Sequence, residues 1–394
     1  MSGSNFLLGV LLARVLSIEI FGQYALLWMV ALFFLSLQQS LIVSPLYTLE
    51  AKRGDNNLHH ISNAIAMQIF FAFLSMFLVI LISIIFSLFQ EKWNMGLLII
   101  PFSLAVFSYL LQDFARRLLF FHGEYMVVIF INIIAYIGLL LTLFIVSSFV
   151  SLNLMIVFSI FAFTFLLSFL VAYLKMGYTH LKISNMESTF QEYWHFSKWL
   201  GLSNILQWLS GNLFIVIGGY VLGAWSVAII RILQNTMGIF NVLFATIENY
   251  VPISAAKIYK KEGHKSLLSY IYKYSFIGII LFSLWTMLFM IITPERLIFL
   301  IYGNKYIQYS DLMYWYMAIY ILMYFGMLIK FVLRTIESTK DIYRANIYMS
   351  VFSIIFAYPM IVYFELKGIV LGILLTQVIM FLFYLIVVKR KIVT

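Results

Sequence analysis

Polar and small side chains recur every three or four residues between positions 231 and 248, inside an otherwise apolar segment. The members of this row are Arg231, Gln234, Asn235, Gly238, Asn241, Ala245 and Glu248. At helical spacing they share one face, which must lie against protein or water rather than lipid. A guanidinium keeps its charge and offers a planar fork of donors, so Arg231 is a candidate phosphate contact. The alternative is helix packing through small and amide residues, with Arg231 bonded to carbonyls or reaching a polar boundary.

Two further cations lie within apolar segments. Lys330 precedes Arg334 by four residues at the end of one segment, and Arg14 lies near the end of the first. A charge within a membrane span is unfavourable, so each is a candidate for binding an anionic group. For Arg14, an anchoring role at the membrane boundary is an equal alternative.

Amide side chains on the same segments could hydrogen-bond to sugar hydroxyls. Outside the row they include Gln39, Asn204 and Gln207, and within it Gln234, Asn235 and Asn241. Hydrogen bonds between helices are the competing explanation for any one of them.

Acidic residues within apolar segments are candidates for ion coupling or gating. Asp113 precedes Arg117 by four residues, and Glu248 ends the polar row. Asp113 could bind a proton or cation, or it could pair with Arg117 across one helical turn. The plainer interpretation of the Asp113–Arg117 stretch is an anchor at the membrane surface.

The composition shows what kind of elements must carry these residues. Of 394 residues, 64% are hydrophobic and 10% are charged, and cysteine is absent. A soluble domain is about 45–50% apolar and about 25% charged, so both a soluble enzyme and a disordered chain are excluded. Without cysteine there are no disulfides, zinc–cysteine sites or iron–sulfur clusters. We expect no cofactor or metal.

Apolar segments separated by short polar breaks predict an all-α polytopic membrane protein with about twelve spans. The segments are 5–17, 21–46, 65–89, 97–121, 127–150, 154–174, 200–222, 224–253, 271–293, 312–331, 347–364 and 368–388. The first would be about 20 Å long, short of the hydrocarbon thickness of about 30 Å. Either that helix is short, or the chain begins late relative to its natural start.

The distribution of basic residues predicts the orientation. With the N-terminus inside, the outer loops hold only Lys92, Arg296, Lys305 and Lys367. Apart from Arg14, Arg231 and Lys330, the rest of the 25 Lys and Arg residues fall on the inner side. This asymmetry follows the positive-inside rule, so both termini should be cytoplasmic. The net charge of +10 is therefore mostly explained by basic residues on the cytoplasmic side, and we expect no nucleic-acid partner.

The longest polar stretch divides the chain in two. We expect an N-terminal six-helix bundle over 1–176, a cytoplasmic linker over 177–198 and a C-terminal six-helix bundle over 199–394. Six spans each would make the halves a parallel repeat. Short matches support it: Phe114–Arg117 reads FARR and Phe331–Arg334 reads FVLR, which pairs Asp113 with Lys330.

The sequence resembles a known family along four stretches. They are LLARVLSIEIFGQYAL at 11–26, DFARRLLFFHGEY at 113–125, IFNVLFATIENYVPISAAKIYKKEG at 239–263 and ERLIFLIYGNKYIQYS at 295–310. These are similar to the polysaccharide transporters, or Wzx-type flippases, of the multidrug/oligosaccharidyl-lipid/polysaccharide (MOP) exporter superfamily.

The resemblance implies a V-shaped pair of six-helix bundles around a cationic central cavity, in the bacterial inner membrane. It implies translocation of undecaprenyl-diphosphate-linked oligosaccharide, a repeat unit of O-antigen, lipopolysaccharide, capsule or exopolysaccharide, by alternating access. Arg231 would hold the diphosphate, with Lys330 or Arg14 assisting, and the amides would hold sugars. A polysaccharide polymerase and chain-length machinery are the expected partners.

Two alternatives remain open. A cation-coupled multidrug antiporter of the same superfamily would favour an aromatic, acidic pocket, but few acidic residues lie deep in these spans. A membrane polymerase or transferase is disfavoured by short outer loops and by the lack of nucleotide-binding or hydrolase motifs. We therefore expect a transporter rather than an enzyme.

Overall fold

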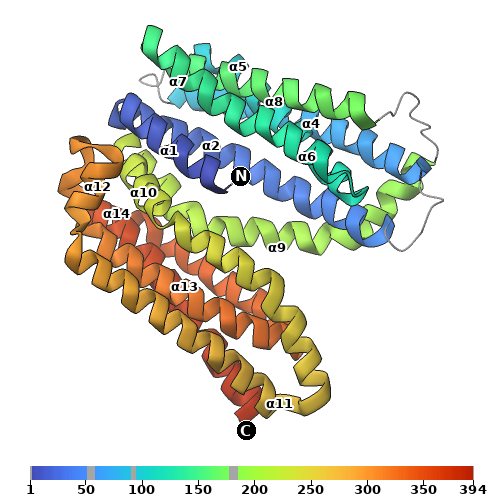
Figure 1. Cartoon of the computed structure of the whole chain (residues 1–394), viewed down its shortest axis with the longest axis vertical. Coiled ribbons are helices and arrows are strands. Elements are labelled where there is room, and N and C mark those ends of the chain that lie inside the picture. The colour runs from blue at the N-terminus through green and yellow to red at the C-terminus, as the bar shows by residue number, and fades with distance from the viewer. Residues whose placement is uncertain (1, 51–57, 90–94, 177–184, 394) are drawn as a thin grey trace. The chain divides into compact units, whose positions relative to one another are not determined.

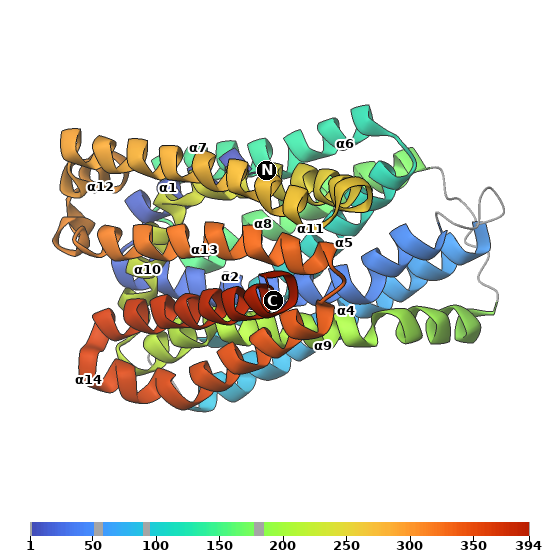
Figure 2. The ribbon, with the colours of Figure 1, turned by 90° about the horizontal axis from the view of Figure 1, so that it is seen from below.

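The structure, a computed structural model, describes residues 2–50, 58–89, 95–176 and 185–393 (Figures 1 and 2). Within these ranges the regular elements are all helices. Helices are what long apolar segments require, because a backbone in lipid has to satisfy its hydrogen bonds within its own segment.

The helices of the first half follow the predicted apolar segments. In chain order they are α1 (Ser2–Val15), α2 (Ile18–Gln38), η1 (Gln39–Val43), η2 (Leu46–Glu50), α4 (Leu58–Phe89), α5 (Met95–Phe121), α6 (Tyr125–Asn132), η5 (Ile133–Gly138), α7 (Leu139–Phe149) and α8 (Leu154–Met176). The segments η1, η2 and η5 are π-helical. They continue their neighbouring α-helices with one wider turn.

The second half contains longer helices. They are α9 (Met186–Val221), α10 (Ala224–Thr236), α11 (Gly238–Ile291), α12 (Pro294–Tyr302), η6 (Asn304–Tyr309, a 3₁₀ helix), α13 (Leu312–Thr335), α14 (Thr339–Val388) and η7 (Lys389–Val393, π-helical). Helix α9 begins fourteen residues before the predicted segment at 200. Helix α11 continues past 253 into the predicted polar break and is interrupted within that break, at Gly263. Lys and Glu are good helix formers, so hydropathy marks the membrane boundary rather than the helix end.

Two long helices each contain a turn. Gly263 in α11 has φ 78° and Glu365 in α14 has φ 50°, and both are non-helical. Glycine adopts positive φ without strain, which suits it to the α11 turn. Among the described residues, nine helices are long and apolar enough to cross a membrane, and two of these span 54 residues. The all-α polytopic fold is confirmed, whereas the count of twelve spans stays a prediction.

Contacts group the chain into two compact units. The first contains Gly3–Leu11 and Leu27–Ile205, and the second contains Leu12–Leu26 and Leu206–Thr394. The division at 176 and 199 stays a prediction. Of the predicted linker, residues 177–184 lie outside the described residues, and the part from 186 onwards is helical.

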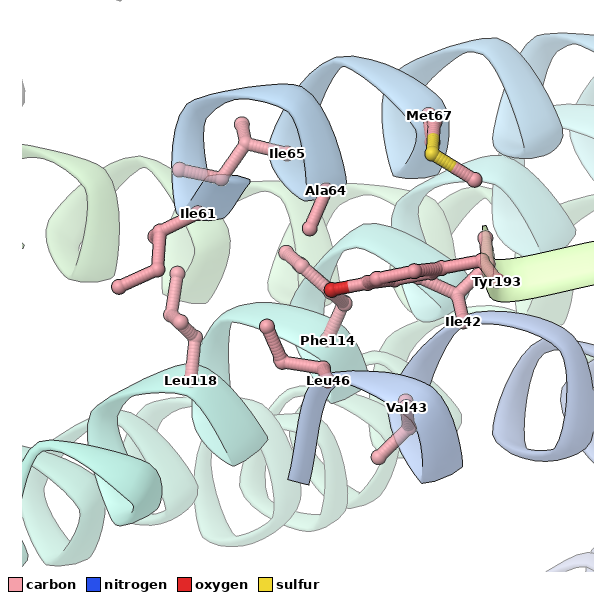
Figure 3. Packing of buried hydrophobic residues seen from close by; sticks show 10 residues of the cluster. All are labelled: Ile42, Val43, Leu46, Ile61, Ala64, Ile65, Met67, Phe114, Leu118 and Tyr193. Atoms are coloured by element: carbon pink, nitrogen blue, oxygen red, sulfur yellow. The ribbon is translucent and has the colours of Figure 1, made fainter. Parts of the chain in front are cut away.

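The first unit is built around α5, which packs against both α4 and α8. A cluster of buried hydrophobic residues in this unit includes Tyr193 from α9 (Figure 3). The Tyr193 ring lies with Ala64 and Met67 of α4 on one side and Ile42 and Val43 of η1 on the other. The first part of α9 is thereby fixed within this unit.

The second unit is built around α13, which packs against both α11 and α14 (Figures 1 and 2). The residues where α1 ends and α2 begins pack with it. Gly22 permits the closest approach, since a Cβ atom there would lie 1.8 Å from the Ala224 carbonyl oxygen at the start of α10. This packing places α10, the start of the predicted polar row, inside the unit.

Candidate functional site around Arg231

The Arg231 guanidinium lies among tyrosines in the second unit. Arg231 is half-buried on α10. The tyrosines within its electrostatic reach are Tyr24, Tyr302, Tyr316 and Tyr320. Among the described residues, no acidic side chain is within ion-pair distance of it. The site therefore offers a cation that no described acidic residue neutralises, with tyrosine side chains within its electrostatic reach.

Tyr302, at the end of α12, fixes one side of this site. Its hydroxyl accepts hydrogen bonds from Asn235 Nδ2 at 3.0 Å and from Thr236 Oγ1 at 3.3 Å. Burial raises the pKa of Tyr302, so the hydroxyl stays protonated and can also donate to the Ile232 carbonyl at 3.5 Å. Asn235 is thus engaged in holding α12 against α10.

Tyr316 presents a different situation. Its side chain is 1% exposed, and its hydroxyl has no hydrogen-bond partner within the described part of the chain. Gln234 lies beside it, but the two groups do not reach hydrogen-bond geometry. An unpartnered buried hydroxyl costs about 1–3 kcal/mol. Such a group next to an uncompensated guanidinium is suited to binding a ligand that accepts hydrogen bonds.

The predicted polar row continues beyond a break. Met237 separates α10 from α11, so the row lies on two helices instead of one. Beyond the break Asn241 lies beside Tyr320, and Asn241 and Glu248 are both exposed. Polar side chains exposed within an apolar span need water or protein rather than lipid, as the row predicted.

A second group of charges lies at the end of α13. Lys330 is half-buried, and the charged groups acting on it are Arg334 and Glu248. Arg334 Nη1 is 3.7 Å from Glu248 Oε1, and the two side chains are 44% and 50% exposed. The Lys330 ammonium makes no hydrogen bond or ion pair with any residue that the structure describes. Lys330 and Arg334 together carry two positive charges and Glu248 carries one negative charge, so the group has a net charge of about +1.

Arg14 lies elsewhere, at the end of α1. Its Nε donates to the Ile301 carbonyl at 2.6 Å, and its Nη2 donates to the Leu300 carbonyl. These carbonyls belong to the last turn of α12, where a cation is favoured by the helix dipole. Of the two roles weighed for Arg14, its donors support the structural one.

In the first unit, the Asp113 carboxylate is paired with two arginines. Asp113, 1% exposed on α5, accepts a hydrogen bond from Arg117 Nε at 2.7 Å and another from Arg116 Nη2. The pairing with Arg117 across one turn is the second of the two arrangements considered for Asp113. Its carboxylate is occupied by guanidinium groups, with the Tyr47 hydroxyl donating to the Arg117 carbonyl at 2.8 Å.

The remaining predicted amides are distributed over both units. Asn204 Nδ2 donates to the Ser36 carbonyl at 3.1 Å, which is a bond between α9 and α2 within the first unit. Gln39 is half-buried in the first unit and Gln207 is exposed in the second. Among the predicted amides of the second unit, Gln234, Asn235 and Asn241 each lie beside a tyrosine that Arg231 also acts on.

Sequence reasoning missed the tyrosines of α13. Tyr316, Tyr320 and Tyr324 are four residues apart, which places them on one helix face. The four-residue spacing could have identified these tyrosines in the sequence, but the chain has 26 tyrosines. The spacing becomes informative only once the structure places Arg231 near Tyr316 and Tyr320.

Comparison with known proteins adds a family and a fold. A family model described as "Polysaccharide biosynthesis protein" matches residues 11–311. A comparison with curated proteins finds no match.

Solved structures of transporters are similar over nearly the whole chain. One is an inward-facing multidrug resistance MATE family transporter of the MOP superfamily, with a TM-score of 0.76, 14% identity, and coverage of 98% of this chain and 94% of that one. Another is the lipid II flippase MurJ in an inward closed conformation, with a TM-score of 0.68, 15% identity, and coverage of 98% of this chain and 85% of that one. A third is the eukaryotic MATE transporter AtDTX14, with a TM-score of 0.64, 12% identity, and coverage of 99% of this chain and 94% of that one. At these identities the likeness shows the fold.

Proposed function

Because the chain belongs to the polysaccharide biosynthesis protein family, we propose that it is a flippase for a lipid-linked oligosaccharide. The substrate would be an undecaprenyl-diphosphate-linked repeat unit of O-antigen, capsule or exopolysaccharide, carried across the cytoplasmic membrane. Transport would proceed by alternating access, as in other transporters built from repeats. One similar solved structure is a lipid II flippase by its description, which supports a lipid-linked substrate.

The observation that carries the proposal is the uncompensated Arg231. A charge in a span is unfavourable unless something pairs with it, and no acidic residue that the structure describes does so. A phosphate would supply the missing charge and accept from the fork of the guanidinium. The Tyr316 hydroxyl beside it could donate to the same group. Lys330 offers a further uncompensated cation in the same unit.

A multidrug antiporter is the competing function, since two similar solved structures are MATE transporters. A site for cationic drugs would favour aromatic side chains together with free carboxylates. The acidic residues within the predicted spans are Asp113 and Glu248, and both lie next to arginines. The charge arrangement therefore favours an anionic substrate, and the likeness to solved transporters over nearly the whole chain supports a transporter rather than an enzyme.

The location follows from the same proposal. The distribution of basic residues supports a multi-pass protein of the bacterial inner membrane with both termini in the cytoplasm. A polymerase acting on the translocated unit, with its chain-length machinery, would then be the downstream partner.

The test is complementation of a strain from which the gene for this chain has been deleted. Surface polysaccharide is measured after expression of the wild type, Arg231→Gln or Arg296→Gln, with membrane levels matched by immunoblot. Arg296 is an exposed arginine of α12 in the same unit and serves as the matched control. We expect Arg231→Gln to abolish surface polysaccharide and Arg296→Gln to retain it. Equal polysaccharide from both variants would remove Arg231 from the mechanism, and a shift in drug resistance alone would favour the antiporter.

A further inference from the structure

The two acidic residues of the predicted spans contact arginines in contrasting ways. Asp113 is buried and accepts from two guanidinium groups, one of them at 2.7 Å. Glu248 is half-exposed and lies 3.7 Å from a guanidinium nitrogen that is itself half-exposed. The Asp113 contacts are those of a structural ion pair. The Glu248 contact is long and solvated, and pairs of that kind contribute about 0–1 kcal/mol.

The charges around Glu248 suit an anion larger than a carboxylate. Lys330 and Arg334 are four residues apart and so lie on one face of α13. Glu248 neutralises one of these two positive charges, and Lys330 has no ion pair within the described residues. A diphosphate carries at least two negative charges and could neutralise both.

This group is separate from the Arg231 site. Arg231 acts on Tyr316 and Tyr320, and Lys330 follows Tyr320 by ten residues. Ten residues of helix span about 15 Å, which is longer than a diphosphate. A diphosphate would therefore occupy the two groups one after the other rather than together.

We propose that Glu248 is an internal competitor for the substrate, an anion that occupies Arg334 and is displaced by a phosphate group of the incoming lipid diphosphate. The inference rests on the proposed function, since it takes the same anionic substrate. Glu248 holds the Arg334 guanidinium in place and balances its charge when no substrate is bound. A weak, solvated pair is suited to this exchange, because little free energy is lost when it opens.

Binding of farnesyl diphosphate, a short polyprenyl diphosphate, to the purified full-length protein in nanodiscs of neutral lipid tests this. We expect Glu248→Gln to bind the probe about two- to fivefold more tightly than the wild type, because the competing carboxylate is gone. Glu262→Gln removes the same charge from an exposed position of α11, 14 residues further along the helix. It should leave the affinity within about twofold of the wild type.

A second comparison separates displacement from general electrostatics. In an Arg334→Gln background Glu248 has no guanidinium to occupy and acts only on Lys330, so Glu248→Gln should tighten binding clearly less than it does in the wild type. An equal gain in both backgrounds, or no gain in the wild-type background, would overturn the proposal. Arg231→Gln measured alongside keeps the two claims apart. If it weakens binding while Glu248→Gln has no effect, only the competitor is refuted, whereas unchanged binding by Arg231→Gln contradicts the proposed function itself.

Discussion

Arg14 and Lys305 cap each other's helices. The Arg14 guanidinium donates to the carbonyls of Leu300 and Ile301 at the end of α12. The Lys305 ammonium, just beyond α12, donates to the carbonyls of Arg14 at 3.0 Å and Leu16 at 3.1 Å, where α1 ends. Each cation lies at a helix C-terminus, where the last carbonyls lack partners and the dipole favours positive charge.

This reciprocal capping predicts that Arg14 contributes to stability and not to substrate binding. Arg14→Gln should lower the free energy of unfolding by about 1–2 kcal/mol, seen as a lower Tm. Its affinity for farnesyl diphosphate should equal that of the wild type. Arg296→Gln, an exposed arginine at the start of α12, should change neither. A loss of affinity in Arg14→Gln without a fall in Tm would restore Arg14 to the diphosphate site.

The buried hydroxyl of Tyr316 predicts opposite effects on stability and binding. Tyr316→Phe removes an unpartnered group, so the protein without substrate should gain up to about 1 kcal/mol in stability. If the hydroxyl donates to a phosphate beside Arg231, the same change should weaken farnesyl diphosphate binding about tenfold. Thermal unfolding and equilibrium binding measure the two effects on one preparation.

Tyr324→Phe is the matched control for this experiment. The Tyr324 hydroxyl donates to the Tyr274 carbonyl at 2.8 Å, so its removal should cost about 1 kcal/mol of stability. Binding of the diphosphate should be unchanged. Should Tyr316→Phe instead lose stability and keep its affinity, its hydroxyl would have a structural role like that of Tyr324.

The ion pairs of Asp113 predict a stability defect rather than a coupling defect. Asp113→Asn leaves two guanidinium groups largely buried without a counterion, which should cost about 3 kcal/mol or more. Replacing Arg116 and Arg117 by Gln in the same protein should restore part of the loss, as measured by Tm. If Asp113→Asn alone keeps the wild-type Tm but loses transport, the result would instead support ion coupling at Asp113.

The fold was largely predictable because lipid restricts the backbone to helices and hydropathy marks where they cross it. The break near Glu365 was predicted, whereas the start of α9 was not, since Glu and Lys extend a helix beyond the membrane boundary without interrupting it. The polar row identified Arg231, but a row on one helix does not tell which helices pack beside it. For that reason the hydroxyl of Tyr316 and the role of Arg14 as a cap emerged only with the tertiary contacts.

The absence of cysteine allows the predicted orientation to be measured directly. Any introduced cysteine is the only thiol in the chain, so labelling reports one position. Arg296 on α12 is predicted to be outside and Lys260 on α11 inside, and both are exposed in the second unit. In intact cells a membrane-impermeant maleimide should label Arg296→Cys and spare Lys260→Cys, because the reagent reaches only the outer side. After permeabilisation both should react, which shows that each thiol is accessible. Labelling of Lys260→Cys in intact cells would show that the predicted orientation is wrong. The Lys330–Glu248–Arg334 group would then lie on the outer side of the membrane.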